Sequence, residues 1–201
     1  TNQHVLDLMI LSWNVNGLAS RWKSNTFQQS IASAGYPDIL ILTETRIRSL
    51  AARNLPGFQT WRRTHGYHHC YWHWSSVSQN KGGAGYGGIC VMSRIKASHV
   101  HFGLPGYCQP EEARVITTIF PSYVLFATYS PNSGSKDNCR FLTKRLQFDE
   151  ALLHHMTTVL AAHPEKSHIL GGDLNVAPLD SDYHPHVFSS IPTTVDPTSP
   201  T

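Results

Sequence analysis

The sequence has 201 residues, of which 40% are hydrophobic and 14% are charged, and this apolar content excludes a wholly disordered chain. Its formal net charge of +3 permits a polyanionic partner without requiring one. Four scattered cysteines without a CxxC pair argue against a disulfide framework or a zinc ribbon, and no apolar run approaches the length of a membrane span.

The first part of the chain predicts a strand, a helix and a second strand. Residues 8–13 and 38–43 are apolar runs typical of buried strands. Between them, Phe27, Ile31 and Ala34 recur at the spacing of one helical face. Two fully apolar strands joined by a helix predict a crossover unit in a sheet that is covered on both faces.

The remaining elements follow the same alternating pattern. We expect a strand at 89–92, a hairpin of 113–120 with 123–129, the longest helix at 138–163 and a strand at 168–171. Beyond Asp180, prolines, serines and threonines replace this pattern. We therefore expect one domain over residues 1–186 and a flexible or extended tail over 187–201.

Polar side chains follow four of the predicted strands. They are Asn14 and Asn16, then Glu44, then Tyr129 and Asn132, and finally Asp173 and Asn175. In layered α/β folds, ligands bind at the carboxyl ends of strands. Carboxylates and amides gathered there would suit Mg²⁺, a hard cation that prefers oxygen ligands. The alternative is that Asn and Asp are ordinary turn residues, and spacing alone leaves both interpretations open.

Six motifs in this order carry a specific resemblance. They are SWNVNGL at 12–18, LTETR at 42–46, GYGG at 85–88, EARVI at 112–116, YSPNSG at 129–134 and GDLNVAP at 172–178. Together they resemble the exonuclease III-type apurinic/apyrimidinic endonucleases of the endonuclease/exonuclease/phosphatase superfamily. The resemblance covers residues 8–186. It implies an α/β (α+β) fold, a four-layered β-sandwich of two mixed sheets flanked by helices, with the second sheet incomplete in this chain.

The resemblance also implies a catalytic centre. By motif, Glu44 would be the principal ligand of Mg²⁺, with Mn²⁺ as a substitute, and Asn14 a nearby metal or water ligand. Asp173 would position or deprotonate the attacking water, and Asn175 would hold that water and a phosphate oxygen. Such groups neutralise charge that develops on a phosphoryl group and make water a better nucleophile.

Further residues would contact the substrate. Tyr129 would act in catalysis by stabilising the phosphate, and Asn132 would bind it, with Tyr86 and Arg114 as further substrate-binding residues. The implied reaction is Mg²⁺-dependent hydrolysis of the phosphodiester 5′ to an abasic site. The expected partner is DNA with abasic sites, and no membrane association is expected. The expected location is intracellular, in the nucleus or mitochondrion if the source is a eukaryote.

One family motif has no counterpart in the sequence. The family ends on a Ser-Asp-His segment whose histidine contacts the scissile phosphate, and none occurs here. We therefore expect a C-terminally truncated domain whose missing segment is either supplied by a second polypeptide or lost, and whether this chain alone is an enzyme stays open. Two alternatives stay open as well. One is a catalytically inactive, structural or nucleic-acid-binding subunit of a larger assembly, and the other is a retrotransposon-type endonuclease, which shares Asn14, Glu44 and Asp173.

Two other patterns point to no separate function. The GxGxxG match at 83–88 precedes a predicted strand instead of a helix, which is the wrong context for a dinucleotide-binding loop. A histidine-rich stretch at 65–73 contains four histidines and Cys70. No pairing within it gives a convincing four-ligand metal site, so we interpret it as a surface insertion.

Overall fold

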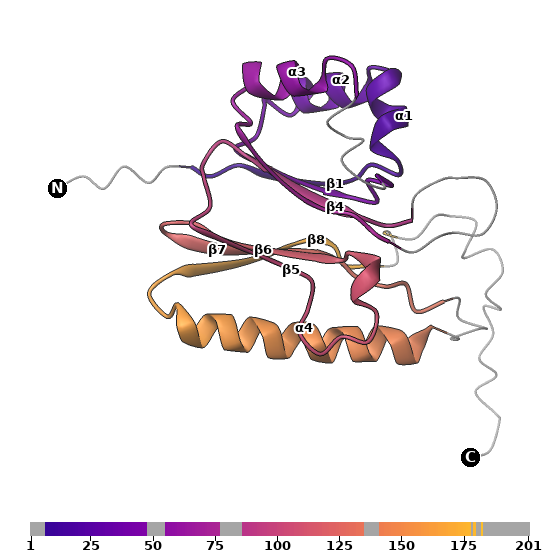
Figure 1. Ribbon diagram of the computed structural model, residues 1–201, viewed down its shortest axis with the longest axis vertical. Helices are drawn as coiled ribbons and strands as arrows, with labels where there is room; N and C mark the ends of the chain where they lie inside the picture. Colours follow the sequence, from indigo (N-terminus) through magenta and orange to yellow (C-terminus); the bar gives the residue numbers. More distant parts are fainter. Residues whose placement is uncertain are drawn as a thin grey trace.

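The computed structural model describes residues 7–47, 55–76, 86–134, 141–177, 179 and 182. Its elements form four layers, in which two sheets pack face to face and helices cover both outer faces (Figure 1). Helices α1, α2 and α3 lie on the first sheet, and α4 lies along the second. This confirms the predicted sandwich of two mixed sheets flanked by helices.

The first sheet has the strand order β1-β2-β4-β3. Its strands are β1 (Ile10–Asn14), β2 (Ile39–Thr43), β3 (His69–His73) and β4 (Ile89–Ser93), and its helices are α1 (Leu18–Lys23), α2 (Thr26–Ser33) and α3 (Phe58–Thr64). Strand β1 is parallel to β2, as the predicted crossover unit requires, and β4 is antiparallel to β2 and β3. Part of the histidine-rich stretch is therefore strand β3.

The second sheet has the order β5-β6-β7-β8. Its strands are β5 (His99–Phe102), β6 (Val115–Ile119), β7 (Tyr123–Tyr129) and β8 (Ser167–Asp173). The short helix η2 (Pro110–Glu112) precedes β6, and helix α4 (Leu142–Ala162) connects β7 to β8. The predicted hairpin is the antiparallel pair β6–β7, and β8 returns through α4 to lie parallel to β7.

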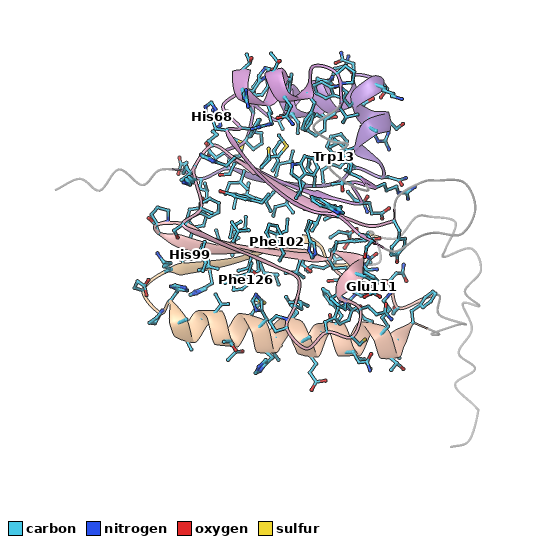
Figure 2. The ribbon with its side chains drawn as sticks, viewed as in Figure 1. Trp13, His68, His99, Phe102, Glu111 and Phe126 are labelled. Atoms are coloured by element: carbon cyan, nitrogen blue, oxygen red, sulfur yellow. The ribbon has the colours of Figure 1, made fainter. Side chains whose placement is uncertain are left out.

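Separate apolar layers hold the sandwich together. Phe27 and Phe58 are fully buried between helices α1–α3 and the first sheet, where Trp13 of β1 stacks on Phe27 with ring centres 5.9 Å apart (Figure 2). Ile41 and Leu125 are buried between the two sheets. Phe126 faces α4 from the opposite side of the second sheet and packs with Val159 (Figure 2). Each apolar strand thus serves two layers, which explains its continuous hydrophobic sequence.

Strand register brings four strand ends together. Asn14 pairs with Thr43 at the end of β1 and β2, and Tyr129 pairs with Asp173 at the end of β7 and β8. Strands β1 and β8 also contact each other across the two sheets. The polar residues that follow these four strands therefore meet at one edge of the sandwich.

Strands β1 and β8 each lie at the edge of a sheet among the described residues. Met9 beside β1, Leu170 in β8 and Val176 beyond it are exposed apolar side chains near these edges. No helix in the described part of the chain is long and apolar enough to cross a membrane. The predicted tail, 187–201, lies outside the described residues.

Candidate active site at the strand ends

Asn14 links two carboxylates that come from different sheets. Its Nδ2 donates to Glu44 Oε1 at 2.8 Å and to Asp173 Oδ2 at 2.9 Å. Its Oδ1 accepts the backbone N–H of Asn16 at 3.1 Å, which fixes the orientation of the amide. Asn14 and Asp173 are 159 residues apart in sequence, so only the packing of β1 against β8 creates this contact.

Glu44 lies at the centre of a network of donors. Besides Asn14, the hydroxyl of Tyr129 donates to Oε1 at 3.1 Å and Arg46 Nη2 donates to Oε2 at 3.0 Å. Partial burial opposes ionisation of Glu44, but these hydrogen bonds and the Arg46 charge outweigh it and hold its pKa below the usual 4.5. Glu44 is therefore a carboxylate at neutral pH.

A buried arginine supports Tyr129 from behind. The Arg114 guanidinium lies 4.6 Å from the Tyr129 ring centre, donates to the Tyr129 carbonyl at 3.0 Å and to the Tyr86 hydroxyl at 3.0 Å. Its Nε donates to Glu112 at 2.6 Å, and Lys144 of α4 pairs with the same carboxylate. Burial raises the pKa of the Tyr129 hydroxyl, helped by the Glu44 charge, so this group stays a proton donor.

Two loops after β7 and β8 line an open depression of about 640 Å³. Asn132 comes from the first loop, Asn175 comes from the second, and Asp173 is the last residue of β8. The loops are tied together, because Asn175 Nδ2 donates to the Ser130 carbonyl at 2.7 Å and the Ser130 N–H donates to the Asp173 carbonyl at 2.8 Å. Asp173 Oδ1 accepts the Asn175 N–H at 3.0 Å.

Backbone strain gathers at the same place. Asn16, Glu44, Arg46, Ala113 and Asn175 all have a positive φ, between 45° and 53°. This left-handed conformation costs most residues other than glycine about 1–2 kcal/mol, and it costs asparagine less. Such strain persists where surrounding contacts enforce it, and it is typical of functional sites.

The donor set fits a hard divalent cation. Glu44 and Asp173 supply carboxylate oxygens on either side of one amide group. Among the described residues, no cluster of three or more His, Cys, Asp or Glu side chains could hold a metal ion. Glu44 and Asp173 could each contribute a carboxylate oxygen to a divalent cation that keeps most of its water ligands.

Each predicted site residue can now be placed. Asn14, Glu44, Tyr129 and Asp173 form one hydrogen-bonded group, and Asn132 and Asn175 line the adjoining depression. Arg114 is buried, and Tyr86 bonds to it. Contact of Arg114 with substrate stays a prediction, because its guanidinium faces protein groups. In the orientation seen, the Asn14 amide presents donors to the carboxylates, so its role as a metal ligand also stays a prediction.

The sequence interpretation missed three supporting residues. Glu112 holds Arg114, Arg46 holds Glu44, and Arg145 binds the loop carbonyls beside Asn175. Two of these follow a spacing of two residues, Glu112 to Arg114 and Glu44 to Arg46, which would have signalled a local pair. Arg145 gave no signal, because its partners are carbonyls far away in sequence.

Comparison with known proteins identifies the family of the chain. A profile described as the Endonuclease/Exonuclease/phosphatase family matches residues 11–198. The chain belongs to this family. Nucleases of the endonuclease/exonuclease/phosphatase superfamily generally use divalent metal ions, and the paired carboxylates are the residues here that could hold one.

Relatives of the chain include an exodeoxyribonuclease and a DNA repair nuclease. The chain is 30% identical over 175 residues to an exodeoxyribonuclease of Bacillus subtilis, covering 87% of this chain and 61% of that protein. It is 32% identical over 176 residues to the DNA repair nuclease APEX1 of Danio rerio, covering 88% and 51%. The chain thus spans less than two thirds of the length of either relative.

Solved structures of the family show the same fold. The 3′ phosphatase NExo from Neisseria, bound to a product DNA hairpin, superposes with a TM-score of 0.67 and 27% identity over 90% of this chain and 63% of that one. An AP endonuclease from Archaeoglobus fulgidus gives a TM-score of 0.63 and 26% identity over 88% and 60%. Both are similar in fold and share about a quarter of their aligned residues.

Proposed function

We propose that this protein is a Mg²⁺-dependent DNA phosphodiesterase that cleaves 5′ to an abasic site. The observation that carries the proposal is the Asn14 amide, which joins Glu44 and Asp173 beside the depression lined by Asn132 and Asn175. Carboxylates for a hard cation and amides for phosphate oxygens are the groups that phosphodiester hydrolysis requires. The nuclease relatives support the same reaction class.

Different residues of the chain would have different roles in the proposed reaction. When bound, Mg²⁺ supplies a positive charge that offsets charge developing on the phosphoryl oxygens. Glu44 would hold it through an oxygen that Tyr129 and Asn14 keep in place. Asn132 and Asn175 would donate amide hydrogens to phosphate oxygens.

Asp173 would handle the attacking water. Its carboxylate is fixed at both oxygens, since Oδ2 accepts from Asn14 and Oδ1 accepts from the Asn175 N–H. A carboxylate held in this way can orient a water molecule and take its proton as the oxygen attacks phosphorus. Because Asp173 and Asn175 lie next to each other, such a water would lie beside the amide that would bind the phosphate.

Further polypeptide would complete the sandwich next to the site. Strands β1 and β8 end at Asn14 and Asp173 and are both sheet edges among the described residues. Exposed edges with apolar side chains such as Met9 and Leu170 favour strand addition and packing. Fragments that correspond to the additional length of the relatives can be co-expressed with this chain, and a lack of complex formation would contradict this part of the proposal.

Incision of a defined duplex tests the function. A duplex with one abasic site is incubated with the protein and Mg²⁺, by itself and with the completing polypeptide, and the 5′-side product is measured on a gel. Glu44→Gln and Asp173→Asn keep the size of each side chain but remove its charge. We expect a rate loss of at least about 100-fold in each, because both groups act on the reacting centre.

Two outcomes refute the assignment. Incision that both variants leave unchanged would exclude Glu44 and Asp173 as the catalytic groups. Binding of the duplex without incision under either condition would favour the alternative of an inactive nucleic-acid-binding subunit. A duplex without the abasic site serves as the control for substrate choice.

A further inference from the structure

We infer that Arg145 of helix α4 is a positioning residue that sets the spacing between the two loops of the candidate active site. One guanidinium nitrogen, Nη1, donates to the Leu174 carbonyl at 2.9 Å, to the Pro131 carbonyl at 3.2 Å and to the Asn175 carbonyl at 3.4 Å. Pro131 belongs to the loop after β7, and the other two belong to the loop after β8. A single side chain from a third element therefore joins both loops.

The Arg145 side chain is itself held in place. Its Nε donates to both carboxylate oxygens of Asp149, one helical turn later, at 2.9 and 2.8 Å. Only 13% of the side chain is exposed. The planar guanidinium group thus has Asp149 on one edge and loop carbonyls on another, and lysine, with one nitrogen, cannot reproduce this arrangement.

The carbonyls that Arg145 binds flank the groups that would contact the phosphate. Pro131 precedes Asn132, and Leu174 lies between Asp173 and Asn175. Asn175 has a φ of 49°, a left-handed conformation that asparagine adopts more readily than other residues with a Cβ. Arg145 acts on its carbonyl, while Ser130 accepts from its side chain. Loss of Arg145 would let the two loops separate and would move Asn132 relative to Asn175.

The positioning role of Arg145 is separate from the proposed function, because Arg145 itself is assigned no contact with substrate. The effect of Arg145 on the incision rate, however, rests on the proposed function. The first test therefore needs no catalysis. Amide hydrogen exchange of the 130–134 and 173–177 loops is compared in the wild type and Arg145→Ala. We expect exchange in both loops to be faster by about tenfold or more, since a charged donor to three carbonyls is lost.

A matched control comes from Arg62 in α3. Its Nη1 also donates to two carbonyls, those of Tyr67 and His68, and its Nε donates to the side chain of Gln59. Arg62→Ala removes the same kind of contact in the first sheet's helical layer. We expect it to leave exchange in the two loops unchanged. If Arg145→Ala does not fold, Arg145→Lys and Asp149→Asn replace it in the comparison.

The second test uses the abasic duplex. Misplacing catalytic groups lowers kcat more than it raises KM, and we expect kcat of Arg145→Ala to fall about 10- to 100-fold. Added methylguanidinium should restore part of this rate, at concentrations that leave the fold intact. It should fail to do so in the Arg145→Ala/Asp149→Ala double variant, which lacks the carboxylate that orients the guanidinium.

The outcomes separate the two proposals. Faster loop exchange in Arg145→Ala but no incision by the wild type, either alone or with the completing polypeptide, would keep the positioning role and refute the proposed function. Unchanged loop exchange in a folded Arg145 variant refutes the positioning role, whatever the activity. Loss of kcat without rescue, with equal acceleration of exchange throughout the protein, also refutes it, because that pattern indicates general destabilisation.

Discussion

Gly172 provides a sharp test of how the candidate site is built. It lies in β8, immediately before Asp173, and pairs with Thr128 of β7. Its φ of 133° is a conformation that side chains with a Cβ rarely adopt. A Cβ at this position would lie 1.9 Å from the Thr128 carbonyl oxygen and 2.9 Å from the Thr128 nitrogen. The obstacle is backbone, so no side-chain rotation can remove it.

The expected cost of Gly172→Ala follows from this geometry. The two strands would have to separate by about 1.5 Å to restore ordinary contact. That movement would break the last hydrogen bonds of the β7–β8 ladder, at about 1 kcal/mol each, and the backbone strain adds about 1–3 kcal/mol. We therefore expect unfolding free energy to fall by about 3–5 kcal/mol, and Asp173 to move away from Asn14.

Gly171→Ala is the matched control. A Cβ there would meet only the end of the Ile41 side chain, at 3.0 Å, which can shift. We expect a loss of about 1 kcal/mol or less from this change. Urea denaturation followed by tryptophan fluorescence measures both variants, and incision assays follow the effect on Asp173. Equal stability losses in the two variants would refute the reasoning about β8.

Three further predictions concern stability. Glu112→Leu should lower the unfolding free energy by about 3–5 kcal/mol, because it leaves the buried Arg114 charge without its carboxylate. The double variant Glu112→Leu/Arg114→Met should lose much less in the same denaturation assay. Equal losses in the two variants would contradict a buried ion pair. Phe148→Ala should cost about 3–5 kcal/mol, since Phe148 is a fully buried residue of α4 that packs in a cluster with Tyr107 and Val115. Leu153→Ala, at a 68% exposed position of the same helix, should change stability by less than about 0.5 kcal/mol. Similar melting-temperature shifts in the two variants would argue against the docking of α4. Burial lowers the pKa of His73 and of His155 below the usual 6.5. The unfolded chain therefore binds more protons than the folded one, and the melting temperature should fall as pH drops below 6.5. If the melting temperature of a His155→Gln variant falls equally steeply, His155 is excluded as a cause.

Much of the fold could be predicted because it depends on local patterns. The apolar runs at 8–13, 38–43 and 123–129 predicted strands β1, β2 and β7 to within about two residues. Helix α3 and strand β3 were not predicted, because the aromatic and histidine residues of 58–73 have no clear period. Strand β5 alternates weakly and is largely exposed, so it lacks the apolar signal of its neighbours.

The residues of the candidate site could be predicted from the sequence, but the contacts between them could not. Asn14, Glu44 and Asp173 each follow a strand, and the family resemblance assigned them together. Their actual contacts depend on side-chain orientation, since Asn14 faces the carboxylates with its nitrogen because its oxygen accepts the Asn16 N–H. Similarly, a sequence cannot show that Arg114 is buried.

The sequence by itself therefore determined most of the apolar strands, the long helix and the polar residues that end the strands, because hydrophobic period and turn chemistry act over a few residues. The layered sandwich was implied by the family resemblance. Only the tertiary structure decided which strand ends meet, how Asn14 joins carboxylates from two sheets, and that Arg145 of α4 connects two loops. These contacts span up to 159 residues and follow from strand register and layer packing, which local patterns do not encode.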